Sequence, residues 1–317
     1  MTRPTEISLR FLPAELTLLL VAVLFSADLQ AEKKTVRVLT IGSSFADDAL
    51  TWLPRIVAAA DHQLIVGKAN RGGCSLERHW NHVAANEQNP QSSEGSPYLG
   101  GKASLKVLLT REERDFVTIQ QVSYQSHDLQ TFQPLNDRLH AYILQHAPNA
   151  TILLHQIRAY RIDDPRFIPP NAGKEPHTHA AKHQQVRDAY HSLANRLGLQ
   201  VLPSIAAMYR ADVHSQWGYR IDSTFDSKTA RYPSLPDQSH SLHVGWSWNK
   251  QADGLHQLRM DGHHASSAGK YLPGCVWFEV LFAESVIGNS FIPEGIAVDY
   301  AAFLQQTAHE TVAGHDQ

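Results

Sequence analysis

Short apolar runs rich in β-branched residues recur along the chain between residues 36 and 205. Each has the length and composition of a buried β-strand, because strands span four to eight residues and favour valine, isoleucine and threonine. The predicted strands are Val36–Ile41, His62–Val66, Phe116–Gln121, Thr151–Gln156 and Leu199–Ile205. Five strands of this kind, separated by longer segments, indicate a parallel sheet rather than a series of hairpins.

Amphipathic stretches with helical spacing alternate with these strands. The first runs from residue 46 to residue 60, and others cover Asn136–Gln145 and Thr178–Leu197. Such alternation predicts an α/β fold, a three-layer α/β/α sandwich of flavodoxin-like architecture with about five parallel strands flanked by helices. Three polar stretches rich in glycine, proline or serine are predicted to be loops on this fold: Asn86–Lys102, Asp163–Pro176 and Arg220–Gly254.

The first 31 residues have the layout of a secretory signal peptide. Arg3 and Arg10 precede the apolar run Leu16–Phe25, and small residues follow it. The run is too short for a stable membrane span, which needs about 20 apolar residues. We therefore expect residues 1–31 to direct the protein to the periplasm or the exterior.

The remaining chain divides into a main domain, residues 32–290, and a C-terminal linker and helix, residues 291–317. The predicted helix is Tyr300–Val312, and its amphipathic pattern suits packing on the main domain or pairing with a second subunit. The pattern does not choose between these two arrangements.

The overall composition is ordinary for a soluble globular protein, with 43% hydrophobic and 19% charged residues. The formal net charge is −3, and no basic stripe runs along the chain, so nothing favours a nucleic acid as partner. Neither a phosphate-binding loop nor a dinucleotide-binding glycine pattern follows a predicted strand, so no nucleotide cofactor is expected.

Two cysteines, Cys74 and Cys275, stand 201 positions apart. An exported protein can keep a disulfide, because the compartment outside the cytoplasm is oxidising. The alternative is a pair of buried thiols, since free cysteine is among the most buried residue types.

A Gly-Ser-Ser sequence follows the first predicted strand, at the carboxyl edge of the sheet where ligands bind in open α/β folds. Serine at the start of a helix has nearby backbone N–H groups that stabilise negative charge, as acyl transfer requires. Ser43 and Ser44 can equally act only as helix caps.

A second informative stretch, DGHHASSAGKYL, lies at Asp261–Leu272, before a predicted apolar helix that begins near Ser266. An Asp-x-x-His pair lets Asp261 fix the tautomer of His264 and leaves the other ring nitrogen free to accept a proton from a serine hydroxyl. His263, only two residues from Asp261, is expected to point away from it.

Together these blocks resemble the SGNH, or GDSL-type, hydrolase superfamily, in particular secreted members with a GNSF-type first block and a GGCSLE-type second block. GSSF at Gly42–Phe45 places Ser44 in the nucleophile position, and Asp261 and His264 complete the triad. NRGGCSLERHW at Asn70–Trp80 is similar to the second block, whose glycine, here Gly73, donates a backbone N–H to the oxyanion.

One block departs from this pattern. The superfamily's third block carries an asparagine that donates to the oxyanion, whereas DFVTIQQVSYQS at Asp115–Ser126 has none. Because a glutamine amide can donate the same hydrogen bond, Gln120 or Gln121 is expected to replace it, with Gln120 the first candidate.

Substrate-binding side chains are expected in two places. Gln156, Arg158, Tyr160 and Arg161 follow the fourth strand, where arginine either binds an anionic substrate group or pairs with Asp163 and Asp164. Further along, Trp246 and Trp248 either form the floor of a sugar site or pack the long loop.

A histidine cluster, His177, His179 and His183, contains the i, i+4 spacing of some zinc sites, but no third ligand is evident. The resemblance implies a secreted serine esterase without cofactor, which acts on a small-molecule or polysaccharide ester, and we expect O-acetyl groups on carbohydrate. The alternatives are a non-catalytic carbohydrate-binding protein on the same fold and a metal-dependent hydrolase that uses the histidine cluster.

Overall fold

The fold is built around a central β-sheet. The computed structural model describes residues 32–168 and 175–314 of the 317-residue chain. Its strand order is β2-β1-β3-β4-β5, and every neighbouring pair is parallel. The strands are β1 Thr35–Gly42, β2 Gln63–Asn70, β3 Phe116–Ile119, β4 Thr151–His155 and β5 Gln200–Leu202. The predicted five-stranded parallel sheet is therefore confirmed, with strand ends that differ by a few residues.

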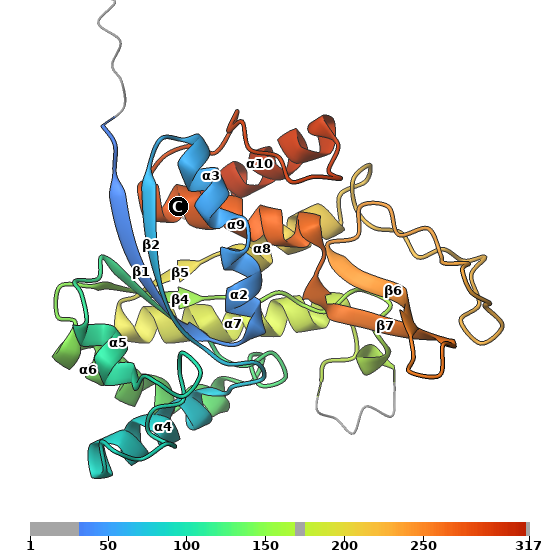
Figure 1. Ribbon diagram of the computed structural model, residues 1–317. Coiled ribbons are helices and arrows are strands. Elements are labelled where there is room, and N and C mark those ends of the chain that lie inside the picture. The colour runs from blue at the N-terminus through green and yellow to red at the C-terminus, as the bar shows by residue number, and fades with distance from the viewer. Residues whose placement is uncertain (1–31, 169–174, 315–317) are drawn as a thin grey trace, which may run out of the picture. The chain divides into compact units, whose positions relative to one another are not determined.

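Helices cover both faces of the sheet (Figure 1). One core layer includes Leu39 and Ile41 of β1 and holds residues of the helices α4 Leu76–Gln88, α5 Leu105–Thr110, α6 Leu135–His146 and α7 His179–Leu197. The other includes Val36 and Val38 and holds residues of α2 Ser44–Leu50, α3 Leu53–Ala59, α8 Ser204–Asp212, α9 Ser267–Phe282 and α10 Val298–Ala313. Two cores on one sheet make the three-layer sandwich that the sequence predicts.

The stretch after β1 forms two helices where the sequence indicated one. α2 ends at Leu50, and α3 begins at Leu53 after a turn at Thr51 and Trp52. Pro54 stands in the first turn of α3, where its missing N–H costs nothing, whereas inside a continuous helix it would remove a hydrogen bond. Gly274 of α9 lies against this turn, close to Leu53 N and Ile56.

The C-terminal helix packs on the body of the fold. α10 lies against α9 and α8, and its Leu304 and Ala308 are buried in the second core. A hydrogen bond from Tyr300 Oη to His240 O (3.1 Å) adds a polar contact. Of the two arrangements open to this helix, the structure shows packing on the main domain.

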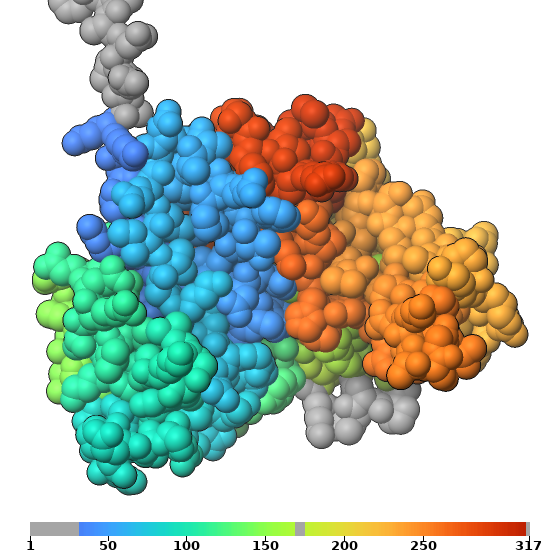
Figure 2. Space-filling view, in the orientation of Figure 1, coloured from blue at the N-terminus to red at the C-terminus, as the bar shows by residue number. Residues whose placement is uncertain are grey.

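An antiparallel hairpin, β6 His243–Lys250 and β7 His256–Ala265, contradicts the prediction that Arg220–Gly254 is entirely loop. The segment lacked an apolar run because both strands are largely solvent-accessible and make no part of the main sheet. Figure 2 shows the hairpin and residues 220–240 together as the orange region at the right. This hairpin carries Asp261 and His264 at its end.

The remaining short elements are the 3-10 turns η1 Leu129–Phe132 and η2 Pro165–Phe167. Cys74 and Cys275 are both buried and free, so the structure shows two thiols and no bridge between them. Within the described residues, no helix is long and apolar enough to cross a membrane. The predicted signal peptide, residues 1–31, lies outside the described residues.

Candidate functional site

The turn between β1 and α2 places both of its serines in the wall of a cavity, with Ser44 the more exposed of the two. Ser43 is the N-cap residue and only 2% exposed, and its N and Oγ both donate to Gln120 Oε1, at 3.1 and 3.0 Å. Ser44 is the first residue of α2, is half-buried and lines the cavity. Ser44 is therefore the more accessible serine, whereas the N–H and hydroxyl of Ser43 are both held by Gln120.

A buried polar network holds this turn in place. Gly42 O accepts hydrogen bonds from Arg71 N (3.0 Å) and from His79 Nε2 (3.2 Å). His79 Nδ1 in turn lies 2.8 Å from Tyr98 Oη. Burial lowers the pKa of His79 to about 3, although its bond to Gly42 opposes the shift, so the ring is neutral at pH 7. A neutral ring can donate to Gly42 O and accept from Tyr98, which satisfies both nitrogens.

The cavity lies at the carboxyl edge of the sheet, where the segments after β1, β2, β3 and β4 meet, and has a volume of about 360 Å³. It is lined by Ser43, Ser44, Phe45, Gly73, Val122, Ser123, Tyr124, Tyr160, Arg166, Glu175 and His263. Gly73 has a φ of +62°, a backbone conformation that glycine adopts without strain. Ser44 precedes β2 in the sequence and Gly73 follows it, and the two predicted site residues thus line the same cavity.

Asp261 lies between two imidazoles at the end of β7. Its Oδ1 accepts from the backbone N–H groups of His263 (3.2 Å) and His264 (3.0 Å). His264 Nδ1 lies 2.9 Å from Oδ2, as the Asp-x-x-His spacing predicts. Burial raises the pKa of Asp261, but the hydrogen bonds from His264 and the nearby rings outweigh it and lower the pKa to about 2. The carboxyl is therefore ionised at neutral pH and can orient a histidine.

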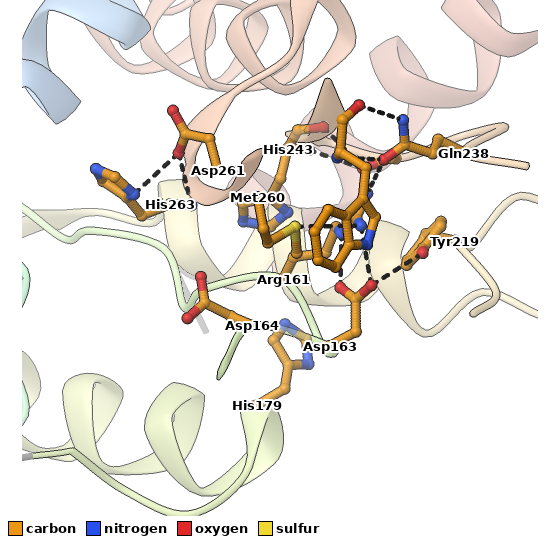
Figure 3. Close-up of polar contacts among 12 residues, drawn as sticks. Arg161, Asp163, Asp164, His179, Tyr219, Gln238, His243, Met260, Asp261 and His263 are labelled. Carbon is orange, nitrogen blue, oxygen red and sulfur yellow. Dashed lines mark hydrogen bonds and ion pairs between the residues drawn. The ribbon is translucent and has the colours of Figure 1, made fainter. Parts of the chain in front are cut away.

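His263 does not point away from Asp261, and the expectation that it would is wrong. Its Nδ1 lies 2.9 Å from Asp261 Oδ1 and 3.0 Å from Arg166 Nη2, and the ring lines the same cavity as Ser44 (Figure 3). A spacing of two residues did not predict this contact. The irregular end of β7 turns the side chains of both His263 and His264 toward the Asp261 carboxylate. Burial lowers the pKa of His263 to about 4 although Asp261 raises it, so the ring is neutral at pH 7.

Neither glutamine proposed for the oxyanion lines the cavity in the described part of the chain. Gln121 Nε2 donates to Thr131 O (3.0 Å) and Thr131 Oγ1 (3.2 Å), and its Oε1 accepts from the backbone N–H groups of Leu76 and Val122. Gln120 Nε2 donates to His155 Nδ1 (2.7 Å), and both glutamines are 1% exposed. Because their amides satisfy buried backbone and ring atoms, they position the turns around the cavity, and the expected donor role is corrected.

Four residues after β4 were expected near the cavity, and the structure places them in different surroundings. Tyr160 lines the cavity, and Gln156 is fully buried with no hydrogen-bond partner for its amide among the described residues. Arg161 pairs with Asp163 at 2.6 Å, as the alternative to substrate binding required (Figure 3). Sequence proximity to the strand end was insufficient, because successive residues point to different sides.

Arg158 is buried and bonds to neither Asp163 nor Asp164, nor does it line the cavity. Its Nη2 donates to Asp48 Oδ2 (2.5 Å) and to His263 O (2.7 Å), and its guanidinium lies over the Phe45 ring at 4.2 Å. Asp48 Oδ2 also accepts from Ala265 N (3.1 Å). This pair joins α2, which carries Ser44, to the end of β7, which carries the histidines, and replaces the predicted substrate contact.

Trp246 and Trp248 pack on the hairpin's neighbouring loop. Trp246 lies against Phe225 and Trp248 against Tyr232, with ring centroids 5.8 and 6.0 Å apart. Trp248 Nε1 also donates to Ser234 O at 2.9 Å. In the described part of the chain neither ring lines the Ser44 cavity, so the structure shows the packing that the alternative predicted, and a sugar contact of these rings stays a prediction.

The histidine cluster near α7 does not gather as a metal site in the structure. His179 Nε2 lies 3.4 Å from Asp212 Oδ2, and His183 stacks on Tyr209 with centroids 3.9 Å apart. Within the described residues, the group with metal-ligand geometry is Asp261, His263 and His264, whose candidate atoms all lie within 4.8 Å of one another. The predicted metal alternative with His177 therefore has no support from this geometry.

Several residues at the site were missed by sequence reasoning. Asp48 and His79 were not among the candidates identified from the sequence. Arg166 and Glu175 lay within a stretch predicted only as a loop, and both line the cavity. Glu175 Oε2 lies 2.6 Å from the fully buried Lys182 Nζ, and its Oε1 accepts from Tyr160 Oη at 2.7 Å. No local signal identifies these partners, because each contact joins distant segments.

Comparisons with known proteins found one family match and several similar solved structures. A family described as "Domain of unknown function (DUF4886)" matches residues 37–167. The crystal structure of a DUF4886 family protein from Bacteroides uniformis ATCC 8492 is 23% identical, has a TM-score of 0.65, and the match covers 89% of this chain and 96% of that one. A member of the lipolytic protein G-D-S-L family from Veillonella parvula DSM 2008 is 10% identical with a TM-score of 0.40, over 78% and 100% of the two chains. No curated protein matches. The first structure shows that the two chains share a fold.

Proposed function

We propose that this protein is a serine hydrolase of the SGNH, or GDSL, type that cleaves ester bonds. The observation that carries the proposal is the cavity shared by Ser44, Gly73 and His263, with Asp261 in contact with both His263 and His264 at the end of β7. These are the groups that acyl transfer needs: a reachable hydroxyl, an oriented base and a backbone N–H donor. The blocks around Gly42, Gly73 and Asp261 resemble that superfamily independently of the geometry.

In the proposed mechanism Ser44 Oγ attacks the ester carbonyl while His264 Nε2 takes its proton. Asp261 holds the Nδ1–H of His264 and stabilises the imidazolium that forms. The N–H groups of Gly73 and Ser44 stabilise the oxyanion. His264 then protonates the departing alcohol, and a water molecule, deprotonated by the same ring, releases the acid from the acyl-enzyme.

His263 is the competing base, because it lines the Ser44 cavity and also contacts Asp261. Replacing each histidine by glutamine in a separate variant distinguishes them. We expect His264→Gln to lower kcat for p-nitrophenyl acetate by on the order of 10³-fold or more, because a base and its orientation are lost together. His263→Gln is expected to cost less than about tenfold. The opposite ranking would assign the base to His263, and wild-type rates for both would refute the triad.

Chelation separates this proposal from a metal-dependent hydrolase. We expect turnover of p-nitrophenyl acetate to persist after incubation with EDTA, because no step of the proposed mechanism passes through a metal ion. Loss of turnover with EDTA and recovery with an added divalent cation would instead support metal-dependent catalysis. Absence of turnover under every condition would favour the non-catalytic carbohydrate-binding alternative.

The proposed substrate is a small O-acyl ester, in particular O-acetyl groups on carbohydrate. The protein is proposed to act on it outside the cytoplasm. A volume of about 360 Å³ and polar walls at Ser123, Tyr160, Arg166 and Glu175 suit a short acyl group and hydroxyl-bearing alcohols better than a fatty chain. We expect acetate release from acetylated polysaccharides, measured enzymatically, and rates with p-nitrophenyl esters that fall as the acyl chain lengthens. Faster hydrolysis of long-chain esters would contradict this choice.

The two tryptophans provide an internal test of the substrate site. Because Trp246 and Trp248 pack on Phe225 and Tyr232, we expect Trp248→Phe to leave KM for an acetylated polysaccharide within about twofold of the wild-type value. Tyr160→Phe, in the cavity wall, serves as the comparison and is expected to raise KM. An increase in KM for Trp248→Phe alone would indicate that the hairpin contributes to the substrate site.

A further inference from the structure

Two histidines and one carboxylate gather at the end of β7 more closely than a catalytic triad requires. A triad needs one imidazole on its aspartate, whereas both His263 Nδ1 and His264 Nδ1 lie 2.9 Å from an oxygen of Asp261. The two rings lie with centroids 3.9 Å apart. Imidazole nitrogen and carboxylate oxygen are preferred ligands of Zn²⁺ in proteins.

The spacing of these atoms approaches that of ligands around a tetrahedral ion. With bonds of about 2.0–2.1 Å, two neighbouring ligands of Zn²⁺ stand roughly 3.3 Å apart. The two nitrogens are 2.9 Å from the carboxylate oxygens, and all three candidate atoms lie within 4.8 Å of one another. The two nitrogens contact different oxygens of the carboxylate, Oδ1 and Oδ2, so the two rings must close on one position to hold an ion. The ion would replace the proton on His264 Nδ1 that faces the carboxylate and the hydrogen bond that Arg166 Nη2 donates to His263 Nδ1.

The cluster is open to an ion and has a suitable charge. The side chains of His263, His264 and Asp261 are 32%, 39% and 32% exposed, so an ion and a water ligand can enter from solvent. Among the described residues, Arg166 is a cation at the cluster, and its Nη2 donates to His263 Nδ1 at 3.0 Å, so an ion must displace this donor. Its charge is matched by Asp164, which it contacts through both Nε (2.8 Å) and Nη2 (2.7 Å). Asp164 thus offsets the charge of Arg166, and Asp261 contributes a negative charge that attracts a metal ion.

We propose that Asp261, His263 and His264 form a binding site for Zn²⁺ or a similar divalent transition metal, and that its occupation inhibits the hydrolase. The inhibitory part rests on the proposed function, because the ion would occupy Nδ1 of His264 and the carboxylate that orients it. A ring bound in this way loses the Asp261 contact that sets its tautomer. The metal would act here as a reversible inhibitor and not as a cofactor.

Isothermal titration of the full chain with ZnCl₂, after EDTA treatment and desalting, tests the site directly. We expect one equivalent to bind the wild type, and His263→Ala to weaken its affinity at least about tenfold because one ligand is lost. His256→Ala is the matched control, since His256 lies on the same strand but stacks on Tyr232, and it should bind as the wild type does. Circular dichroism melts verify that both variants fold.

Absence of zinc binding by the wild type, or equal affinity in His263→Ala, would overturn the site. Inhibition is measured separately with p-nitrophenyl acetate, each variant compared with its own zinc-free rate. Zinc is expected to lower the wild-type rate. The zinc concentration that gives half-maximal inhibition is expected to be at least about tenfold higher for His263→Ala than for the wild type. Binding without inhibition would overturn the inhibitory role, whereas a chain that binds zinc but never hydrolyses esters would refute the proposed function and leave the site standing.

Discussion

Replacing Ser44 by alanine is expected to lower kcat for p-nitrophenyl acetate by on the order of 10⁴-fold or more, with little change in the free energy of unfolding. The hydroxyl is the proposed nucleophile, and removal of a triad serine leaves only the rate that binding and the oxyanion donors support. Ser44 is half-buried at the cavity, so its loss creates no void in the core. Steady-state kinetics and urea denaturation of the same preparations measure the two quantities.

Ser43→Ala is the matched control, one residue earlier in the same turn. It removes the hydrogen bond from Ser43 Oγ to Gln120 Oε1 but leaves the bond from Ser43 N. A buried hydrogen bond contributes roughly 0.5–1.5 kcal/mol to stability, so this variant should be slightly less stable and retain most of its activity. A larger loss of kcat for Ser43→Ala than for Ser44→Ala would place the nucleophile at residue 43 and invalidate the assignment.

Replacing Arg158 by methionine is expected to lower the free energy of unfolding by about 3 kcal/mol, because it removes the closer of the two cations that pair with a buried carboxylate. The side chains of Arg158 and Asp48 are 4% and 10% exposed, and their closest atoms lie 2.5 Å apart. After the substitution Asp48 keeps Ala265 N and the more distant Lys270 Nζ, at 3.1 and 3.7 Å. Urea denaturation followed by circular dichroism measures the change.

An exposed ion pair provides the comparison for this effect. Arg196 and Asp137 lie 2.7 Å apart with side chains 39% and 37% exposed. Because exposed pairs contribute little, Arg196→Met should change the free energy of unfolding by less than about 1 kcal/mol. If Arg158→Met were equally mild, Arg158 would not be the counterion on which Asp48 depends.

Arg158→Met should also impair catalysis in the fraction that remains folded. Arg158 Nη2 donates to His263 O, and Asp48 accepts from Ala265 N, so the pair fixes the backbone on both sides of His264. A displaced β7 end would move the base relative to Ser44, and misplacement by about 1 Å can cost 10²-fold in rate. Unchanged kcat in folded protein would show that the β7 end is held by other contacts.

The sequence by itself determined the sheet and most of its helices. The strands from Val36 to Ile205 were recognisable because a parallel strand is buried on both faces and must be continuously apolar. Ser44 and the pair Asp261 and His264 were also identifiable as candidates, because the chemistry of a strand-to-helix turn and of an Asp-x-x-His spacing depends on neighbours within a few residues. Their catalytic roles stay predictions that the variants above test.

Only the tertiary structure decided which polar side chains face the cavity. Gln120 and Arg158 are buried partners of Ser43 and Asp48, contacts that span 77 and 110 residues and leave no local pattern. The hairpin of β6 and β7 escaped detection because it buries little apolar surface and so lacks a strand's hydrophobic signal. The direction of His263 was likewise set by where the chain turns around Asp261. Local spacing fixes which elements form, whereas the pairing of buried charges and amides depends on segments that meet only after folding.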